Sequence, residues 1–135
     1  MPAHALSQYA PQALAALRIM TALLFIAHGA QKLLAFPAPM PMEIQLFSLM
    51  GLAGVLEFFG GILILIGLLT RPVAFILSGQ MAAAYFMGHA SQSFYPSLNG
   101  GDAAILFCFV FLYLVFAGPG AWSVDGMRVR QAATA

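Results

Sequence analysis

Charged residues are so scarce in this chain that it cannot cover itself with a water-soluble surface. Lys, Arg, Asp and Glu make up 7% of its 135 residues, whereas hydrophobic residues make up 62%. Soluble domains carry about 25% charged residues, and disordered chains have low hydrophobicity. Both classes are therefore excluded, and the composition predicts an integral membrane protein in contact with the lipid bilayer.

The few charges and the single cysteine exclude further classes of protein. Five Lys and Arg residues against four Asp and Glu residues leave a net charge of +1. That is too little for the basic face of a nucleic-acid-binding protein. Because Cys108 is the one cysteine, an internal disulfide, a Cys-x-x-Cys redox pair and a cysteine-rich zinc site are also excluded.

Four apolar runs have the length, or nearly the length, of a membrane-spanning helix. Such a helix needs about 20 mostly apolar residues. The runs predict helices over residues 13–34, 46–69, 72–88 and 101–117. Prolines and glycines in the connections forbid helix or end it. We therefore predict one all-α domain over residues 1–135, an integral membrane four-helix bundle.

The arginines predict how this bundle is oriented. With four spans both termini lie on the same side, and short cytoplasmic loops are enriched in Lys and Arg. The terminal side collects four arginines, whereas the opposite side has only Lys32. The four are Arg18, Arg71, Arg128 and Arg130. We expect both termini in the cytoplasm and a multi-pass location in the cytoplasmic membrane.

Ionisable side chains from all four predicted helices fall at similar depths. With a rise of about 1.5 Å per residue, one layer in the outer half of the bundle would contain His28, Lys32, Glu57, His89 and Asp102. Their spacing places His28, Gln31 and Lys32 on one helix face. An intramembrane charge is costly and is normally paired, so we expect Glu57 to pair with Lys32 or His28. Gly60 and Gly61 indicate either close helix packing or space for a ligand beside Glu57.

Short motifs spread over residues 14–126 carry a family resemblance. They are Arg18, His28-Gly29-Ala30-Gln31-Lys32, Glu57 with Gly60-Gly61, Gly67 with Thr70-Arg71, Asn99-Gly100-Gly101-Asp102, and Gly118 to Asp125. In this combination the chain resembles the DoxX family of small bacterial membrane proteins. The resemblance implies four helices in the bacterial inner membrane. It also implies a subunit of an oxidoreductase, such as one that couples sulfur oxidation to quinone, or of a complex that handles oxidative or thiol stress.

Our first functional hypothesis is a redox-complex subunit with a quinone-binding site. Glu57 and His28 are the candidate catalytic residues, as a proton relay. The candidate substrate-binding residues are His28, Gln31, Lys32, Glu57, His89, Asn99 and Asp102. The chain contains no evident flavin or iron–sulfur motif, so a redox partner subunit or the substrate would supply the electrons.

Three alternatives remain open. The polar layer could be a structural network that fixes helix register in an assembly protein without catalysis. Transport of a small organic solute would need a homo-oligomer, because four helices leave little room for alternating access. A haem or metal site could use His28 and His89 with oxygen ligands from Glu57 and Asp102, but no metal-ligand spacing motif is present and we name no metal site.

Overall fold

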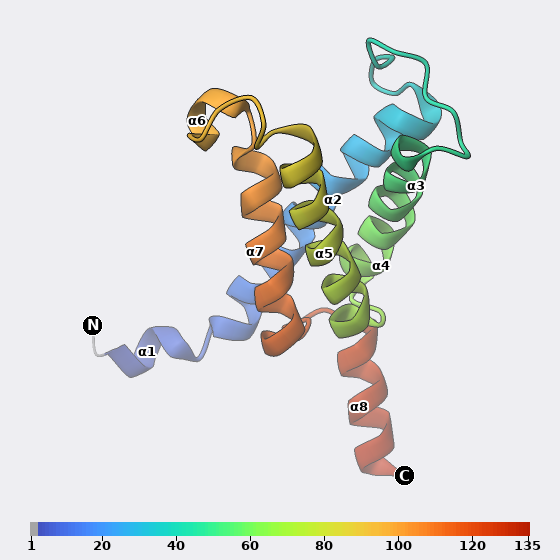
Figure 1. The fold of residues 1–135 in the computed structure, drawn as a ribbon. Coiled ribbons are helices and arrows are strands. Elements are labelled where there is room, and N and C mark those ends of the chain that lie inside the picture. Colours follow the sequence, from blue (N-terminus) through green and yellow to red (C-terminus); the bar gives the residue numbers. More distant parts are fainter. Residues whose placement is uncertain (1–2) are drawn as a thin grey trace.

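The computed structural model describes residues 3–135, and this part of the chain is all-helical with no strand (Figure 1). The long helices are α2 (Ala10–Leu34), α5 (Thr70–Gly88) and α7 (Asp102–Ala117). A further continuous run consists of α3 (Leu49–Val55), the π-helical turn η1 (Leu56–Gly60) and α4 (Gly61–Ile66). Short helices complete the chain: α1 (Ala3–Ser7), α6 (Pro96–Asn99) and α8 (Val124–Thr134).

Local capping explains where the long helices differ from the runs predicted over residues 13–34 and 46–69. Helix α2 begins earlier because Pro11 fits the first turn of a helix. Helix α3 begins later because Ser48 is its N-cap and accepts a hydrogen bond from the Gly51 N–H at 3.1 Å. Helix α4 ends before residue 69 because Gly67 adopts the left-handed conformation at φ 67°.

The long helices pack as two pairs. Helix α2 packs along α3–η1–α4, and α5 packs along α7. The pairs share a core that includes Phe25 from α2, Ile64 from α4, Leu77 from α5 and Phe111 from α7. Phe25 and Phe111 make an edge-to-face contact with ring centroids 4.9 Å apart. Towards the end where α6 lies, the two pairs diverge (Figure 1).

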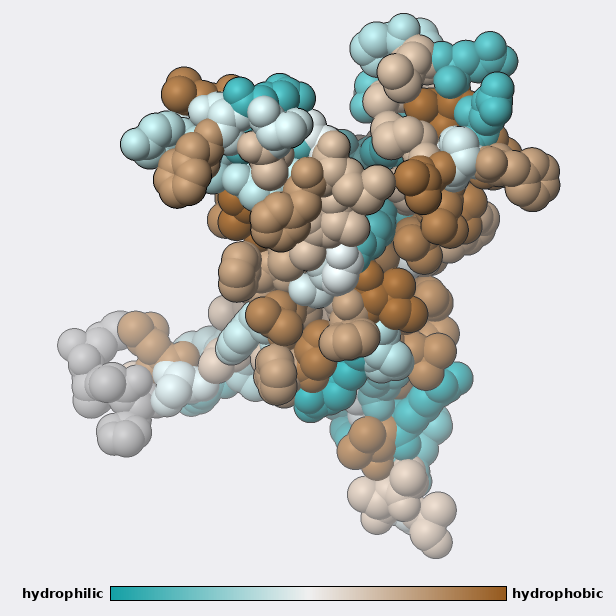
Figure 2. Space-filling model, viewed as in Figure 1, coloured by the Kyte–Doolittle hydropathy of each residue, from teal (hydrophilic) through white to brown (hydrophobic). Residues whose placement is uncertain are grey.

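Two helical segments in the described part of the chain are long and apolar enough to cross a membrane, namely α2 and the run Leu49–Ile66. Helix α7 is apolar but shorter, with 16 residues. Helix α5 has 19 residues but does not reach the same hydropathy. In Figure 2 hydrophobic residues cover the middle of the molecule, and hydrophilic residues gather towards its two ends. This distribution suits a protein that contacts lipid along its sides.

Glycines bring the helix backbones into close contact. A Cβ atom at Gly29 would lie 2.4 Å from the backbone nitrogen of Phe58, so α2 and η1 touch there. At Gly60 and Gly61 a Cβ atom would meet side chains of Leu77 and Ile26, at 2.9 and 2.6 Å. The space beside these two glycines is therefore filled by packed side chains, and of the two interpretations of Gly60-Gly61 the structure favours helix packing.

Candidate functional site

Glu57 lies in the single π-helical turn of the described chain, between α3 and α4. Such turns interrupt α-helices rarely and are frequent at functional sites. The glutamate is buried, with 4% of its surface exposed. Because Gly29 allows α2 to approach the η1 backbone, the following turn of α2 comes within reach of the Glu57 carboxylate.

Lys32 forms an ion pair with Glu57. Its Nζ atom lies 2.7 Å from Glu57 Oε2, and the two side chains are 12% and 6% exposed. The predicted pairing of Glu57 with Lys32 is confirmed. Because little water reaches this ion pair, the attraction between its two charges is stronger than in solution. Each ion has also lost its hydration, which costs free energy.

Gln80 of α5 also contacts this ion pair, although α5 belongs to the other two packed helices. From α5 its Nε2 atom donates to Glu57 Oε1 at 3.3 Å and to the Ala53 carbonyl at 3.4 Å. Its own Oε1 atom is buried and has no hydrogen-bond partner among the described residues. A buried acceptor without a donor is uncommon and costs free energy. We call Lys32, Glu57 and Gln80 the Glu57 cluster.

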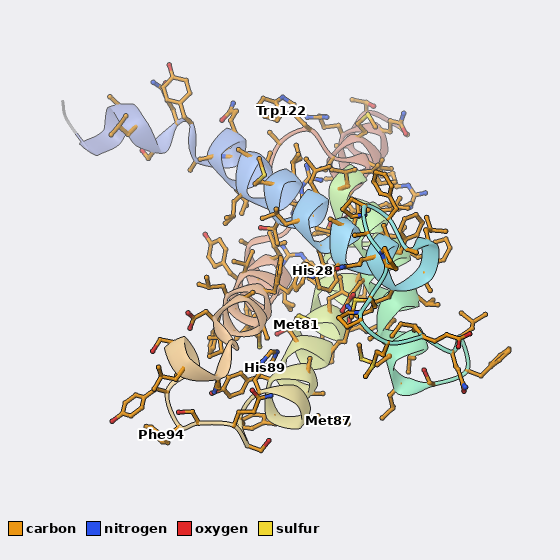
Figure 3. The ribbon with its side chains drawn as sticks, turned by 90° about the horizontal axis from the view of Figure 1, so that it is seen from above. His28, Met81, Met87, His89, Phe94 and Trp122 are labelled. Carbon is orange, nitrogen blue, oxygen red and sulfur yellow. The ribbon has the colours of Figure 1, made fainter. Side chains whose placement is uncertain are left out.

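His28 and Gln31 lie on the same stretch of α2 as Lys32, but neither is joined to the Glu57 cluster by a hydrogen bond in the described structure. His28 is exposed, and its ring contacts Phe107 of α7 edge to face at 5.9 Å. Viewed from above, His28 lies beside α2, apart from His89 at the end of α5 (Figure 3). His28 therefore lies between α2 and α7 with an exposed side chain.

Two other predicted site residues, His89 and Asn99, belong to a second group at the connection between α5 and α7. Asn99 is 3% exposed, and its side chain donates to the Tyr85 hydroxyl at 3.2 Å and to the Ser93 carbonyl at 3.0 Å. It also accepts from the Gly101 N–H at 2.8 Å. The Nδ1 atom of His89 lies 2.9 Å from the Asn99 carbonyl oxygen. These bonds hold the loop between α5 and α7 in place.

The predicted layer is thus not one group, because Lys32 and Glu57 lie in the Glu57 cluster and His89 lies in the second group. His28 has no hydrogen bond to either group in the part of the chain that the structure describes. Asp102 opens α7 with an exposed side chain and joins neither group. Within the described residues, no three His, Cys, Asp or Glu side chains are clustered so as to hold a metal ion.

At the opposite end of the helices, Arg18 serves as a buried clamp. Its side chain is fully buried, and Nη1 donates to the carbonyls of Ile64 and Leu65 at 3.0 and 2.9 Å. Nη2 donates to the carbonyls of Ala121 and Trp122 at 3.1 and 2.8 Å. The carbonyls that end a helix lack partners within it, so Arg18 satisfies the end of α4 and fixes the chain that follows α7.

Arg71 and Asp125 complete the capping at this end. Arg71 Nη1 donates to the carbonyls of Val115 and Phe116, both at 2.7 Å, at the end of α7. The two carboxylate oxygens of Asp125 accept the backbone N–H groups of Leu69 and Thr70, both at 2.9 Å, where α5 begins.

The position of Asp125 changes its acidity. Partial burial raises the pKa of the Asp125 carboxyl, but the backbone hydrogen bonds from Thr70 and Leu69 and the charge of Arg128 outweigh that effect. The net result is a pKa below the ordinary value of 3.8. Asp125 therefore stays ionised at neutral pH and stabilises the positive end of the α5 dipole.

Comparison with known proteins identifies the family. The sequence profile of DoxX matches residues 13–90, which is more than half of the chain. The chain belongs to the DoxX family. The match runs from α2 to the end of α5 and so includes the whole Glu57 cluster, together with Arg18 and Arg71. Asn99 and Asp102 lie beyond it.

Similar sequences occur in several bacteria. An uncharacterised protein of Haemophilus influenzae is 45% identical over 132 residues, which cover 89% of this chain and 93% of the relative. The inner membrane protein YqjF of Escherichia coli is 32% identical over 80% of this chain and 85% of its own. An uncharacterised membrane protein of Mycobacterium tuberculosis is 28% identical over 93% of this chain and 86% of its own length. No solved structure gives a significant match. Family membership and the two long apolar helices support a membrane location.

Sequence reasoning missed two features of this DoxX protein. Gln80 was not among the predicted site residues, and its unpaired acceptor beside Glu57 had no sequence signal. Asp125 was not among the predicted site residues either, although it caps the start of α5. The Ser123-Val124-Asp125-Gly126 stretch starts a helix with a Ser N-cap, whose hydroxyl accepts from the Gly126 N–H at 3.0 Å, and that capping pattern could have predicted α8.

Proposed function

We propose that this DoxX-family protein spans the bacterial inner membrane with four helices and has both termini in the cytoplasm. The support is the apolar character of α2, of the run Leu49–Ile66 and of α7, and the name of the relative in Escherichia coli. Arginines at the α8 end favour the cytoplasm for that end. Helix α5 would be held in the membrane by its packing against α7.

Within this arrangement, we propose that the Glu57 cluster binds the polar head group of a quinone and that the protein is a subunit of a membrane redox complex. The observation that carries the proposal is the buried, unpaired Oε1 atom of Gln80 beside a carboxylate and an ammonium group. Ionisable residues inside a membrane mark functional sites by default. An unpaired acceptor in the same place can take a hydrogen bond from the donor group of a ligand.

The residues fit such a head group. Lys32 Nζ is a donor for a carbonyl oxygen, and Gln80 Oε1 is an acceptor for a hydroxyl. A bound quinone would supply two-electron, two-proton chemistry. The Glu57 carboxylate, which Lys32 and Gln80 hold in position, would be the acceptor for a proton released when the quinol is oxidised. His28 lies on α2, one turn from Lys32, and its exposed side chain would pass protons between the cluster and the surface. A partner subunit would supply the electrons.

The experiment compares two substitutions on α5. Gln80→Leu removes the unpaired acceptor but leaves the Lys32–Glu57 ion pair intact. Ser78→Ala is the control, because Ser78 faces α7 and donates to the Cys108 carbonyl at 2.8 Å. A ligand that binds the folded state alone raises the melting temperature. We expect decylubiquinone to raise the melting temperature of the wild type and of Ser78→Ala in detergent, but not that of Gln80→Leu. An equal rise in all three proteins would contradict the proposed site.

A second function is favoured by the closed Lys32–Glu57 pair, whose 2.7 Å contact leaves no gap between the charges. Under this alternative, the Glu57 cluster fixes helix register in a membrane assembly protein without catalysis. Gln80→Leu would then lower the melting temperature of the protein without ligand. Decylubiquinone would not change the melting temperature of the wild type. Extraction of quinones from protein purified in mild detergent separates the two functions, because the assembly protein would carry none.

A further inference from the structure

Helix α8 stands away from the packed helices, and two cavities lie beside its first turns. No residue of α8 is buried, and the helix projects from the end of the molecule where α4 meets α5 (Figure 1). One cavity, of about 540 Å³, has a lining that includes Leu69, Arg71, Asp125, Arg128 and Val129. We call it the Arg71 cavity. A second cavity, of about 410 Å³ and including Trp122 and Arg130, lies beside the same helix.

The Arg71 cavity presents two cations to whatever occupies it. Arg71 and Arg128 both line it and both have exposed side chains. Arg71 is held in place, because Nη1 donates to two carbonyls at the end of α7. Its remaining guanidinium nitrogens make no hydrogen bond within the described residues. A cation already fixed in one position loses little conformational freedom when it binds an anion.

Asp125 offsets only one of these two positive charges. Its two oxygens accept the backbone N–H groups of Leu69 and Thr70, so the carboxylate is directed at the start of α5. Two arginines against this one aspartate leave the lining of the cavity net positive. The charge of the cavity is therefore complementary to an anion.

Apolar side chains line the same cavity beside the arginines. Leu69 is 53% exposed and Val129 is 70% exposed. Pro72 and Pro119 add further apolar surface, and Trp122 is exposed near the second cavity. Exposed tryptophan is typical of the zone where a bilayer meets water. A free inorganic anion would leave this apolar surface unused, whereas a lipid would contact both parts.

We propose that the Arg71 cavity binds the head group of an anionic phospholipid. The phosphate contacts Arg71 and Arg128, and the glycerol and first acyl carbons contact Leu69 and Val129. The inference goes beyond the quinone site, because the Arg71 cavity lies towards the opposite end of the helices from the Glu57 cluster. It requires only that this end of the bundle lies at a membrane surface, whichever leaflet that is.

Native mass spectrometry of the full chain in mild detergent tests the proposal, with dioleoyl phosphatidylglycerol and dioleoyl phosphatidylcholine as probes. The informative variant is Arg128→Gln. Arg130→Gln is the matched control, because it removes the same charge from the same helix but lines the other cavity. Both side chains are exposed and α8 has no buried residue, so both variants should fold.

We expect the wild type to bind phosphatidylglycerol in preference to phosphatidylcholine. Arg128→Gln should raise the apparent Kd for phosphatidylglycerol about five-fold, the effect of roughly 1 kcal/mol that one arginine contributes near an anionic surface. Arg130→Gln should change it less than two-fold. Equal binding of the two lipids by the wild type would overturn the proposal. An equal loss in the two variants would also overturn it, because it would indicate general charge attraction. Neither outcome affects the quinone test, which uses substitutions on α5.

Discussion

The ion pair between Lys32 and Glu57 predicts strong energetic coupling between the two residues. The perturbation is a double-mutant cycle of Glu57→Gln, Lys32→Met and the double variant. At 2.7 Å, Coulomb's law with an effective dielectric constant of about 20 gives an attraction of roughly 6 kcal/mol. Loss of hydration cancels much of it, because each buried ion costs several kcal/mol. The net value of the pair is therefore small, although each partner depends strongly on the other.

The consequences differ for single and double substitutions. Removing one partner leaves a nearly buried charge without its counterion, and such losses amount to about 3–5 kcal/mol. We expect about 3 kcal/mol for each single variant, near the lower limit because Lys32 is 12% exposed. The double variant leaves no unpaired charge, so its cost should be at least about 2 kcal/mol less than the sum of the two.

The free energy of unfolding can be measured by SDS titration of the purified protein in mixed micelles, followed by circular dichroism. The control cycle combines Glu57→Gln with Arg128→Gln, because Arg128 on α8 shares no contact with the Glu57 cluster. That cycle should be additive within about 0.5 kcal/mol. If the Lys32 and Glu57 substitutions are equally additive, the two residues are not coupled and the account of the cluster is refuted.

Three further predictions concern backbone contact, acid sensitivity and orientation. Gly29→Ala should destabilise the protein by about 1–3 kcal/mol, because its Cβ atom would meet the Phe58 backbone; Gly79→Ala, where a Cβ atom meets nothing within 4 Å, is the control, and equal effects would contradict this. Asp125→Ala should cost about 1 kcal/mol at pH 7. Since the pKa of Asp125 is lowered from 3.8, the stabilisation that its carboxylate gives is present above about pH 4 and is lost as the pH falls through that lowered pKa. The melting temperatures of the wild type and Asp125→Ala should therefore converge in acid. A difference that stays constant with pH would argue against the cap. Green fluorescent protein fused after residue 135 should fluoresce, whereas an active alkaline phosphatase fusion at the same position would refute the cytoplasmic terminus.

The Lys32–Glu57 pair could be predicted from the sequence because the free-energy cost of an unpaired charge in an apolar helix limits the possible partners of Glu57. A glutamate within an apolar run must find a cation, and helical rise places Lys32 at a similar depth. The grouping of the other polar residues could not be predicted in this way. Depth along the helix says nothing of which helices are neighbours, and α5 turned out to pack mainly on α7. His89 and Asn99 therefore bond each other, and Gln80 is the residue that reaches Glu57.

Orientation by positive charge becomes clearer once the hydrogen bonds are known. By sequence, four arginines at one end opposed one lysine at the other. Arg18 is fully buried and donates to four carbonyls, so its charge does not contribute to the surface charge at this end. The charge of Lys32 is offset by Glu57, with which it pairs. Three arginines then remain at the α8 end, with no unpaired lysine or arginine against them among the described residues. The charge asymmetry that favours a cytoplasmic α8 end thus survives the removal of both buried cations, since the residues that carry it, Arg71, Arg128 and Arg130, are all exposed.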